Sequence, residues 1–133
     1  DVVLVGGGSG AAGVCLFAKQ NPNAQVFIGA RDAQHLLMPN SKNVHVATDD
    51  GSQGYQGTVA ELLRQKLKTG KFFINCGPIP MVDAVMPTER LFAPPDKIYS
   101  AIEYTTRCGV GVCGSCADKK GLRSCVEGPF VNR

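Results

Sequence analysis

The sequence lacks long apolar runs and has little excess charge of either sign. A bilayer-spanning helix needs roughly 18–20 consecutive apolar residues, and no segment of the chain reaches that length, so we expect no membrane span. Fourteen basic residues face 11 acidic ones, which gives a formal net charge of only +3. The chain also has no basic run and no basic residues interleaved with aromatic ones, which argues against nucleic acid binding.

Internal repeats, low-complexity segments and a signal peptide are also lacking. A hydrophobic fraction of 44% is enough for a core, which argues against disorder of the whole chain. The length of 133 residues suits one ordinary domain, or one domain with a small appendage. The chain opens on an apolar run typical of a strand already under way. Natural proteins rarely start inside their first strand, so we expect that Asp1 is not the native N-terminus.

Six cysteines are present, and they are unevenly placed. Cys15 and Cys76 stand alone, whereas the other four lie between residues 108 and 125. An even number of cysteines in a short chain is typical of secreted disulfide scaffolds. The first hundred residues, however, resemble a cytosolic α/β domain that needs no cross-links. The four clustered cysteines therefore indicate ligands of a metal or a metal cluster, and Cys15 is expected in the core.

Strand-like and helix-like segments alternate through the first part of the chain. Thr58 and Glu61 suit a capping box at the start of a helix, Gly70 suits its C-cap, and Pro87 should end the next helix. Such alternation implies an α/β fold with a parallel sheet and right-handed crossovers. The expected strands are residues 2–5, 24–30, 44–48 and 72–76, and the expected helices are residues 11–19, 58–69 and 81–85.

A glycine-rich turn follows the first expected strand. Residues 8–13 read GSGAAG and match the pattern G-x-G-x-x-G. In this pattern the backbone approaches a pyrophosphate closely, and the phosphates lie against the N-terminus of the following helix. We interpret the turn as a dinucleotide site, with a purely structural tight turn as the alternative. The candidate residues are Gly6, Gly7, Gly8, Ser9 and Gly10.

Small and polar residues follow the other expected strands. Open α/β sheets bind ligands at the carboxyl ends of their strands, so these residues are candidates for the same crevice. Arg31 suits a 2′-phosphate and Asp32 suits a ribose hydroxyl, which leaves the choice between NAD and NADP open. A solvated loop pair is the alternative for these two residues. The further candidates are Thr48, Asp49, Cys76, Gly77 and Pro78.

The clustered cysteines have the spacing C-x4-C-x2-C-x8-C. Plant-type [2Fe-2S] sites share the pattern C-x4-C-x2-C followed by a distant fourth cysteine. Structural zinc sites usually combine two C-x2-C pairs, and only Cys113 and Cys116 form such a pair here. We therefore assign Cys108, Cys113, Cys116 and Cys125 as [2Fe-2S] ligands, with a zinc site and two disulfides as the alternatives. Gly109, Gly111 and Gly114 would let the loop curl around the cluster.

Composition changes after residues 87–97, a connector that contains three prolines. Beyond it the chain is rich in cysteine and glycine and has little periodicity. We therefore predict a boundary near residue 98, which divides the chain into an NAD(P)-binding domain of residues 1–97 and a [2Fe-2S] cluster domain of residues 98–133.

These motifs together resemble a known family. CGVGVCGSC and GLRSCVEGPF are similar to the C-terminal cluster domain of dihydroorotate dehydrogenase electron-transfer subunits, and VGGGSGAAG, GAR, TDDGSQGYQGTV and CGPIPM resemble their NAD-binding half. The resemblance covers nearly the whole chain. It implies the fold of the ferredoxin-NADP reductase superfamily.

The same resemblance implies a function. Electrons would pass from NADH to FAD, then to the [2Fe-2S] cluster, and then to FMN in a catalytic subunit that oxidises dihydroorotate to orotate in pyrimidine biosynthesis. It places Cys76, Gly77 and Pro78 near the nicotinamide, and Thr48 and Asp49 in the same crevice. A small buried hydrophobe is the alternative for Cys76. The chain would act as one subunit of a cytoplasmic hetero-oligomeric oxidoreductase. Because cofactors carry the redox chemistry, the two histidines have no assigned role.

The chain departs from the family in several places. The family carries an N-terminal β-barrel with an Arg-x-Tyr-Ser/Thr motif that binds FAD, and this chain has neither, so FAD would come from another segment. Gly13 stands where the family usually has proline. Related subunits of hydrogenases and sulfite reductases share the architecture, which leaves the final acceptor open. Two functions outside this scheme also fit the sequence. One is a nucleotide-binding module with a structural zinc site, and the second is a ferredoxin-like docking protein that no longer binds nucleotide.

Overall fold

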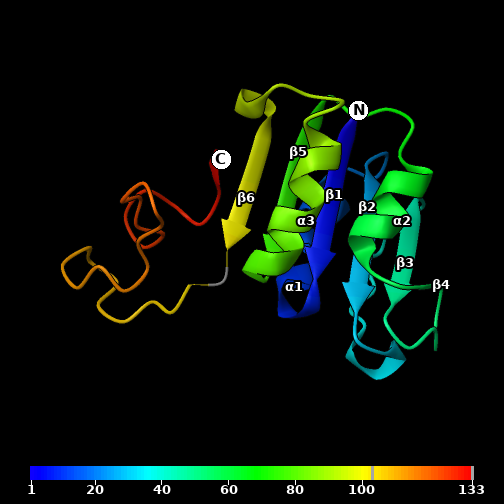
Figure 1. Ribbon diagram of the computed structural model, residues 1–133, viewed down its shortest axis with the longest axis horizontal. Helices are drawn as coiled ribbons and strands as arrows, with labels where there is room; N and C mark the ends of the chain where they lie inside the picture. Colours follow the sequence, from blue (N-terminus) through cyan, green and yellow to red (C-terminus); the bar gives the residue numbers. More distant parts are fainter. Residues whose placement is uncertain (103, 133) are drawn as a thin grey trace.

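The computed structural model describes residues 1–102 and 104–132, and its centre is one sheet of seven strands. Its order is β4-β3-β2-β1-β5-β6-β7 (Figure 1), and all neighbouring strands are parallel except β6 and β7. The α/β fold with a parallel sheet is therefore confirmed. The strands are β1 (Val2–Gly7), β2 (Gln25–Ala30), β3 (Val44–Thr48), β4 (Tyr55–Gln56), β5 (Phe72–Gly77), β6 (Ile98–Ile102) and β7 (Val131–Asn132).

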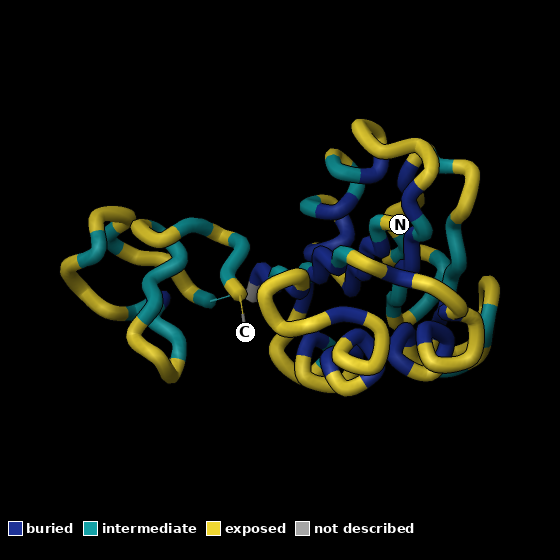
Figure 2. The backbone as a smooth tube through the Cα atoms, turned by 90° about the horizontal axis from the view of Figure 1, so that it is seen from above, coloured by how far each residue is buried: buried dark blue, intermediate teal, exposed yellow. Residues whose placement is uncertain are grey.

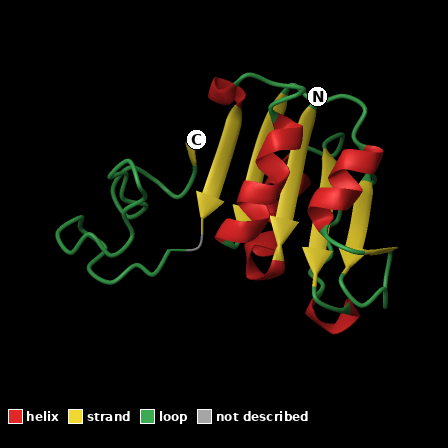
Figure 3. Cartoon of the chain, viewed as in Figure 1, coloured by secondary structure: helices red, strands yellow, loops and turns green. Residues whose placement is uncertain are grey.

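Helices cover both faces of this sheet. Helix α1 (Ala11–Gln20) lies on one face, and α2 (Val59–Lys66) and α3 (Ile79–Glu89) lie side by side on the other (Figure 3). Successive strand residues point to opposite faces, so each strand supplies two cores. In β1, for example, Leu4 packs toward α1 while Val3 and Val5 pack toward α2 and α3. This double burial explains why the strands read as almost continuous apolar runs.

The start of α2 follows the prediction, but its end does not. Thr58 Oγ1 accepts a hydrogen bond from the Glu61 N–H at 3.2 Å, and Glu61 Oε2 accepts one from the Thr58 N–H at 2.8 Å, which completes the capping box. The helix then ends at Lys66 with Leu67 as its C-cap, so the expectation of Gly70 in that role is wrong. Leu67 has extended backbone, and its side chain is buried in the same core as those of Leu62 and Leu63.

Helix α3 continues through Pro87 and ends at Glu89, so the expectation that Pro87 ends the helix is also wrong. Proline removes one backbone hydrogen bond and crowds the preceding turn. Tertiary contacts offset that loss, because Val82 and Val85 are completely buried. The Glu89 carboxylate additionally accepts hydrogen bonds from Asn75 Nδ2 at 3.1 and 2.9 Å.

The sheet continues past the boundary expected near residue 98. Strand β6 pairs with β5 in parallel, and β7 returns to pair with β6 in the antiparallel direction. Between them, residues 104–130 leave the edge of the sheet as an irregular loop (Figure 1), most of which is half-buried or exposed (Figure 2). Division of the chain into two domains therefore stays a prediction. Within the described part of the chain, every helix falls short of what a bilayer crossing requires.

A candidate dinucleotide crevice and a cysteine loop

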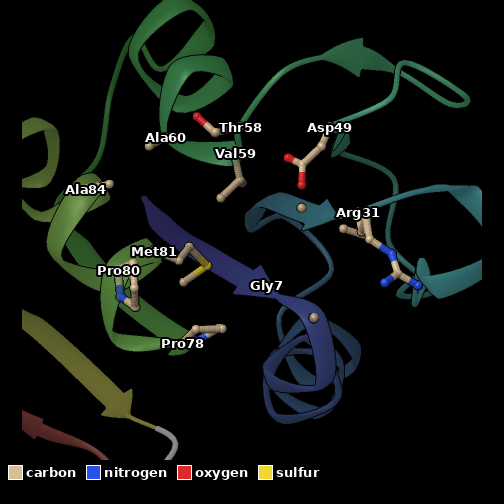
Figure 4. A pocket seen from close by; sticks show the side chains of 13 residues that line it. Gly7, Arg31, Asp49, Thr58, Val59, Ala60, Pro78, Pro80, Met81 and Ala84 are labelled. Atoms are coloured by element: carbon tan, nitrogen blue, oxygen red, sulfur yellow. The ribbon is translucent and has the colours of Figure 1, made fainter.

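A pocket of about 430 Å³ opens at the carboxyl ends of the parallel strands (Figure 4). This is the place where open α/β sheets bind ligands, and the volume suits a small molecule. The turn after β1, the ends of β2 and β3, and the N-terminal turns of α2 and α3 all contribute. Its lining residues are Gly7, Gly8, Gly29, Ala30, Arg31, Asp49, Thr58, Val59, Ala60, Pro78, Pro80, Met81 and Ala84.

Five of the residues that the sequence analysis assigned to the nucleotide line this pocket, and seven do not. The lining ones are Gly7, Gly8, Arg31, Asp49 and Pro78. The others lie beside or behind the wall of the pocket, where several of them hold the wall in place. They are Gly6, Ser9, Gly10, Asp32, Thr48, Cys76 and Gly77.

The glycine turn has one open position, Gly8, and three tightly packed ones. A Cβ at Gly7 would lie 2.3 Å from the Met81 sulfur, and Gly6 and Gly10 are similarly crowded. Gly8 has φ +55, in the left-handed region, and open space where a side chain would lie. A Cβ at Gly10 would lie 2.4 Å from the Cys76 carbonyl oxygen, and a Cβ at Gly6 would lie 2.6 Å from the Val14 side chain. Gly6 and Gly10 therefore let α1 and its turn sit against β1 and β5, while Gly8 leaves the backbone open to a ligand.

Thr48 and Cys76 lie behind the pocket. Thr48 is completely buried, and its Oγ1 donates to the Gln53 carbonyl at 2.7 Å and accepts from the Gln53 N–H at 3.1 Å. It thereby closes the loop that follows β3. Cys76 packs with the core on the α1 side of the sheet, where a Cβ at Gly13 would come within 3.2 Å of its sulfur. The small residue Gly13 thus makes room for the Cys76 thiol.

Asp32 organises the end of β2 rather than the pocket. Its Oδ1 accepts hydrogen bonds from the Gln34 and His35 N–H groups at 3.0 and 3.1 Å, which caps the short 3₁₀ turn Ala33–His35. The His35 side chain lies 2.7 Å from the same oxygen, and Arg31 Nε donates to Oδ2 at 3.2 Å. The hydrogen bond with His35 and the other donors lower the pKa of Asp32 to about 2, so the carboxylate is ionised at neutral pH.

Sequence reasoning missed the contribution of the two helix starts. Thr58, Val59 and Ala60 open α2, and α3 opens directly after Pro78. The N-terminal turn of a helix presents free backbone N–H groups and a partial positive charge, which favours an anion. The capping box at Thr58 was the signal that could have placed α2 here, since it marks a helix that begins just after β4.

The four clustered cysteines lie in the irregular loop between β6 and β7, and all six cysteines of the chain carry free thiols. That finding counts against the disulfide alternative. Backbone N–H groups of Cys113, Val110 and Val112 point at the Cys108 sulfur, and together with the Cys113 thiol they lower the pKa of Cys108 to about 6. Hydrogen bonds stabilise a thiolate in the same way in reactive and metal-binding cysteines.

A second pair of thiols lies further along the same loop. The Cys125 N–H and the Ser124 side chain lower the pKa of Cys116, whereas the contact with the Cys116 thiol raises the pKa of Cys125. The negative charge of Cys108 also raises the pKa of Cys125, whereas the hydrogen bond from the Gly111 N–H lowers it. The four sulfurs therefore form two contacting pairs that influence one another. Within residues 1–102 and 104–132, no three histidine, cysteine or acidic side chains are arranged to hold a metal ion.

Three further contacts shape this loop. Arg123 Nη1 donates to the Gly111 carbonyl at 3.0 Å, and Arg123 Nη2 pairs with Glu127 Oε1 at 2.7 Å. Ser115 Oγ donates to the Thr105 carbonyl at 2.7 Å. The donor set of four thiols, with amide N–H groups already directed at the sulfurs, fits the chemical needs of a [2Fe-2S] cluster.

Curated relatives match almost the whole chain. The sequence is 34% identical over 139 residues to the "Probable dihydroorotate dehydrogenase B (NAD(+)), electron transfer subunit" of Methanocaldococcus jannaschii, a match that covers 96% of the chain and 53% of the relative. The protein of the same name from Archaeoglobus fulgidus is 34% identical, with 98% and 59% covered. The chain thus spans about half the length of the curated relatives it matches. No protein-family model matches the chain.

A solved structure supports the same relationship. The chain superimposes with a TM-score of 0.74 on an NADH-dependent reduced ferredoxin-NADP oxidoreductase, at 27% identity over 98% of the chain and 51% of that structure. Part of a type IV self-sufficient cytochrome P450 monooxygenase shares the fold, with a TM-score of 0.60 at 16% identity over 86% of the chain and 22% of that structure. The sheet is thus the Rossmann-like sheet of the ferredoxin-NADP reductase type. Nearly the whole chain is therefore related to about half the length of the dihydroorotate dehydrogenase B electron transfer subunits.

Proposed function

We propose that this chain carries electrons from NAD(P)H, through FAD held by residues outside the chain, to a [2Fe-2S] cluster and then to a catalytic partner. The relatives' names favour a dihydroorotate dehydrogenase as this partner. By the motif resemblance, it would contain FMN and act in pyrimidine biosynthesis. In such a hetero-oligomer the chain would be one part of an iron-sulfur flavoprotein oxidoreductase.

One observation carries this proposal: a single sheet bears both candidate sites. The pocket lies at the ends of β1, β2, β3 and β5, and the cysteine loop leaves the same sheet through β6 and returns to it through β7. A protein that moves electrons between cofactors needs to hold and orient them, and it needs no acid-base or nucleophilic side chain of its own. The two sites on one scaffold suit that task.

On the nucleotide side, the glycine turn would receive the pyrophosphate. Gly8 offers an open backbone there, while Gly6, Ser9 and Gly10 keep the turn against the sheet. The start of α2 supplies further N–H groups toward a phosphate. Cys76, Gly77 and Pro78, at the end of β5, would lie near the nicotinamide, where the apolar side chains of Pro78, Pro80 and Met81 line the pocket.

On the cluster side, Cys108, Cys113, Cys116 and Cys125 would be the ligands. When bound, a [2Fe-2S] cluster accepts and releases one electron at a time. The chain's own contribution is to present thiolates and to surround them with N–H groups, which tune the reduction potential of such clusters. The N–H groups directed at Cys108 and Cys116 suit this role. Because the four clustered cysteines are assigned to a metal cluster and not to disulfides, we also propose that the protein works in the cytoplasm.

A different catalytic partner is the second candidate. The related structure at 27% identity belongs to an NADH-dependent reduced ferredoxin-NADP oxidoreductase, whose name does not include dihydroorotate. Anaerobic co-purification of the chain from its native cells, followed by identification of the subunit bound to it, distinguishes the two. Recovery of an FMN-containing dihydroorotate dehydrogenase supports the first candidate, and recovery of another oxidoreductase subunit supports the second.

The proposal is tested most simply by metal analysis. The chain is reconstituted anaerobically with iron and sulfide, and its iron, acid-labile sulfide and zinc are counted. We expect about two irons and two sulfides per chain, with a brown colour and visible absorption. A colourless protein with one tightly bound zinc would instead identify the cysteine loop as a structural zinc site, and the electron-transfer function would have to be withdrawn.

A further inference from the structure

The two ends of the pocket differ in chemistry. Pro78, Pro80 and Met81 make the end beside β5 and α3 apolar, whereas the opposite end, beside β2 and β3, contains Arg31 and Asp49. Of the residues that line the pocket, these two alone carry charge. Figure 4 shows the Asp49 carboxylate directed toward the pocket and the Arg31 side chain running away from it.

The order of the strands determines which part of a dinucleotide meets this charged end. The sheet runs β3-β2-β1-β5, so the glycine turn after β1 lies between the two ends of the pocket. The proposed function places the pyrophosphate at that turn and the nicotinamide near β5. The adenosine ribose then has to lie on the other side, next to Arg31 and Asp49. The 2′ position of that ribose is where NADPH carries the extra phosphate.

Arg31 is already engaged away from the pocket. Its Nε donates to Asp32 Oδ2 at 3.2 Å, and its Nη2 lies 3.1 Å from His35 Nε2. A guanidinium only donates hydrogen bonds. Arg31 Nη2 also lies 3.4 Å from His35 Nδ1, so the shorter contact assigns His35 Nε2 as the acceptor. His35 Nδ1 then carries the proton and donates it to Asp32 Oδ1, at 2.7 Å. Asp32 thus compensates the charge of Arg31, and Asp32 and His35 together hold its guanidinium beside the 3₁₀ turn.

Asp49 is in the opposite situation. Its backbone N–H donates to the Ala30 carbonyl at 3.1 Å, which fixes the residue at the rim of the pocket. Its side chain is exposed, and in the described part of the chain no group donates a hydrogen bond to its carboxylate. A free carboxylate accepts hydrogen bonds from a ribose diol and repels a phosphate dianion.

We propose that Asp49 is the residue that selects NADH against NADPH in this pocket, and that Asp32 is a positioning residue for the same choice because it holds Arg31 away from the 2′ position. This inference rests on the proposed function, since it requires that the pocket binds a dinucleotide. The selectivity then depends on the free carboxylate of Asp49 and on the hydrogen-bonded state of Arg31. The sequence alone does not show which of these charged side chains is free and which is hydrogen-bonded.

The test compares two ligands that differ only in the 2′-phosphate. Binding of adenosine 5′-monophosphate and adenosine 2′,5′-bisphosphate is measured by calorimetry, together with binding of NADH, for the unaltered chain and its variants. Asp49→Asn removes the charge at the rim. Asp32→Asn keeps an oxygen to cap the turn but removes the charge that holds Arg31. Asp96→Asn changes the net charge equally at an exposed site outside the pocket, and serves as the control.

We expect Asp49→Asn to improve the affinity for the bisphosphate relative to the monophosphate by about tenfold, which lies between the effect of one unit charge in bulk water and its effect near a protein surface. Asp32→Asn should give a smaller gain, which disappears when Arg31→Ala is added, because a released Arg31 supplies that gain. Asp96→Asn should leave the ratio unchanged. A merely structural role would lower both affinities together instead of changing their ratio.

Three other results would overturn all or part of the inference. They differ in whether the proposed function also has to be withdrawn. If Asp49→Asn leaves the ratio unchanged while the unaltered chain binds NADH, Asp49 does not select, and the proposed function stands. If the gain in Asp32→Asn survives the addition of Arg31→Ala, Asp32 has no positioning role. If the unaltered chain binds neither NADH nor the monophosphate, the proposed function and the inference fall together.

Discussion

At the scale of single residues, Glu89 is the most unusual group of the core. It is completely buried, and its carboxylate receives hydrogen bonds from Asn75 alone among the described residues. Burial raises its pKa from the usual 4.5 to about 7, against the smaller opposing effect of the Asn75 amide. Two neighbouring polar atoms, Asn75 Oδ1 and Ser100 Oγ, are buried without a partner in the described structure. The chain therefore folds most favourably when the Glu89 carboxyl group is protonated.

This predicts that the chain loses stability as the pH rises. Below pH 4.5 Glu89 is protonated in both the folded and the unfolded chain. Between that pH and about 7 the unfolded chain binds fewer protons than the folded one, so the free energy of unfolding falls by about 3 kcal/mol from this residue. Urea unfolding at several pH values measures it. Glu89→Gln should lack this part of the decline; parallel curves for the two proteins would contradict the assignment.

Gly10 and Gly13 offer a matched pair of substitutions in the glycine turn and its helix. A Cβ at Gly10 would meet the backbone of Cys76 at 2.4 Å, which cannot yield easily, whereas a Cβ at Gly13 would meet only the Cys76 sulfur at 3.2 Å. Gly10→Ala should lower the free energy of unfolding by about 1–3 kcal/mol and weaken dinucleotide binding. Gly13→Ala should have a much smaller effect. Equal losses in the two variants, measured by thermal unfolding and NADH titration, would contradict this account.

At the scale of secondary-structure elements, α2 depends on its capping box. Thr58→Ala removes the acceptor for the Glu61 N–H and should lower the free energy of unfolding by about 1 kcal/mol. Thr58→Ser keeps that oxygen and should retain most of the stability. Thr69→Ala alters an exposed loop threonine and is the control. Chemical denaturation measures all three, and a loss in Thr58→Ala no larger than that in Thr69→Ala would argue against the role of the cap.

Elements with strong local signals were predictable from the sequence. The apolar runs predicted β1, β2, β3 and β5, the glycine turn predicted the start of α1, and the Thr58–Glu61 spacing predicted the start of α2. Local signals did not predict features that depend on contacts between residues far apart in the chain. Pro87 does not end α3, because the buried face of that helix holds it together. The pairing of β6 and β7 with the edge of the sheet joins residues far apart in the chain, and no local pattern shows that.

The candidate sites were predictable to a similar degree. The rule that ligands bind at strand ends led to Arg31, Asp49 and Pro78, which line the pocket. The rule does not say which way a strand-end side chain points, and Thr48 is buried in its own loop. Cysteine spacing indicated the loop between β6 and β7. It could not show that the Cys108 and Cys116 sulfurs receive backbone hydrogen bonds, because those bonds depend on the path of the folded loop.

At the scale of the whole molecule, the pocket and the cysteine loop share one sheet. If the four loop cysteines are the ligands, Cys→Ser at any one of Cys108, Cys113, Cys116 or Cys125 should abolish the visible absorption of the reconstituted cluster. Cys15→Ser is the matched control, since Cys15 lies in α1 and outside the loop, and it should keep the full absorption. Full cluster content in the Cys113 variant would defeat the ligand assignment.

The central claim is that this chain holds a redox-active [2Fe-2S] cluster, and an EPR spectrum tests it most directly. The chain is reconstituted anaerobically, reduced by one electron, and its signal is quantified against the protein concentration. We expect a rhombic signal that integrates to about one spin per chain, with about two irons. An EPR-silent chain that contains zinc instead of iron would contradict the claim, and the cysteine loop would then be a structural site.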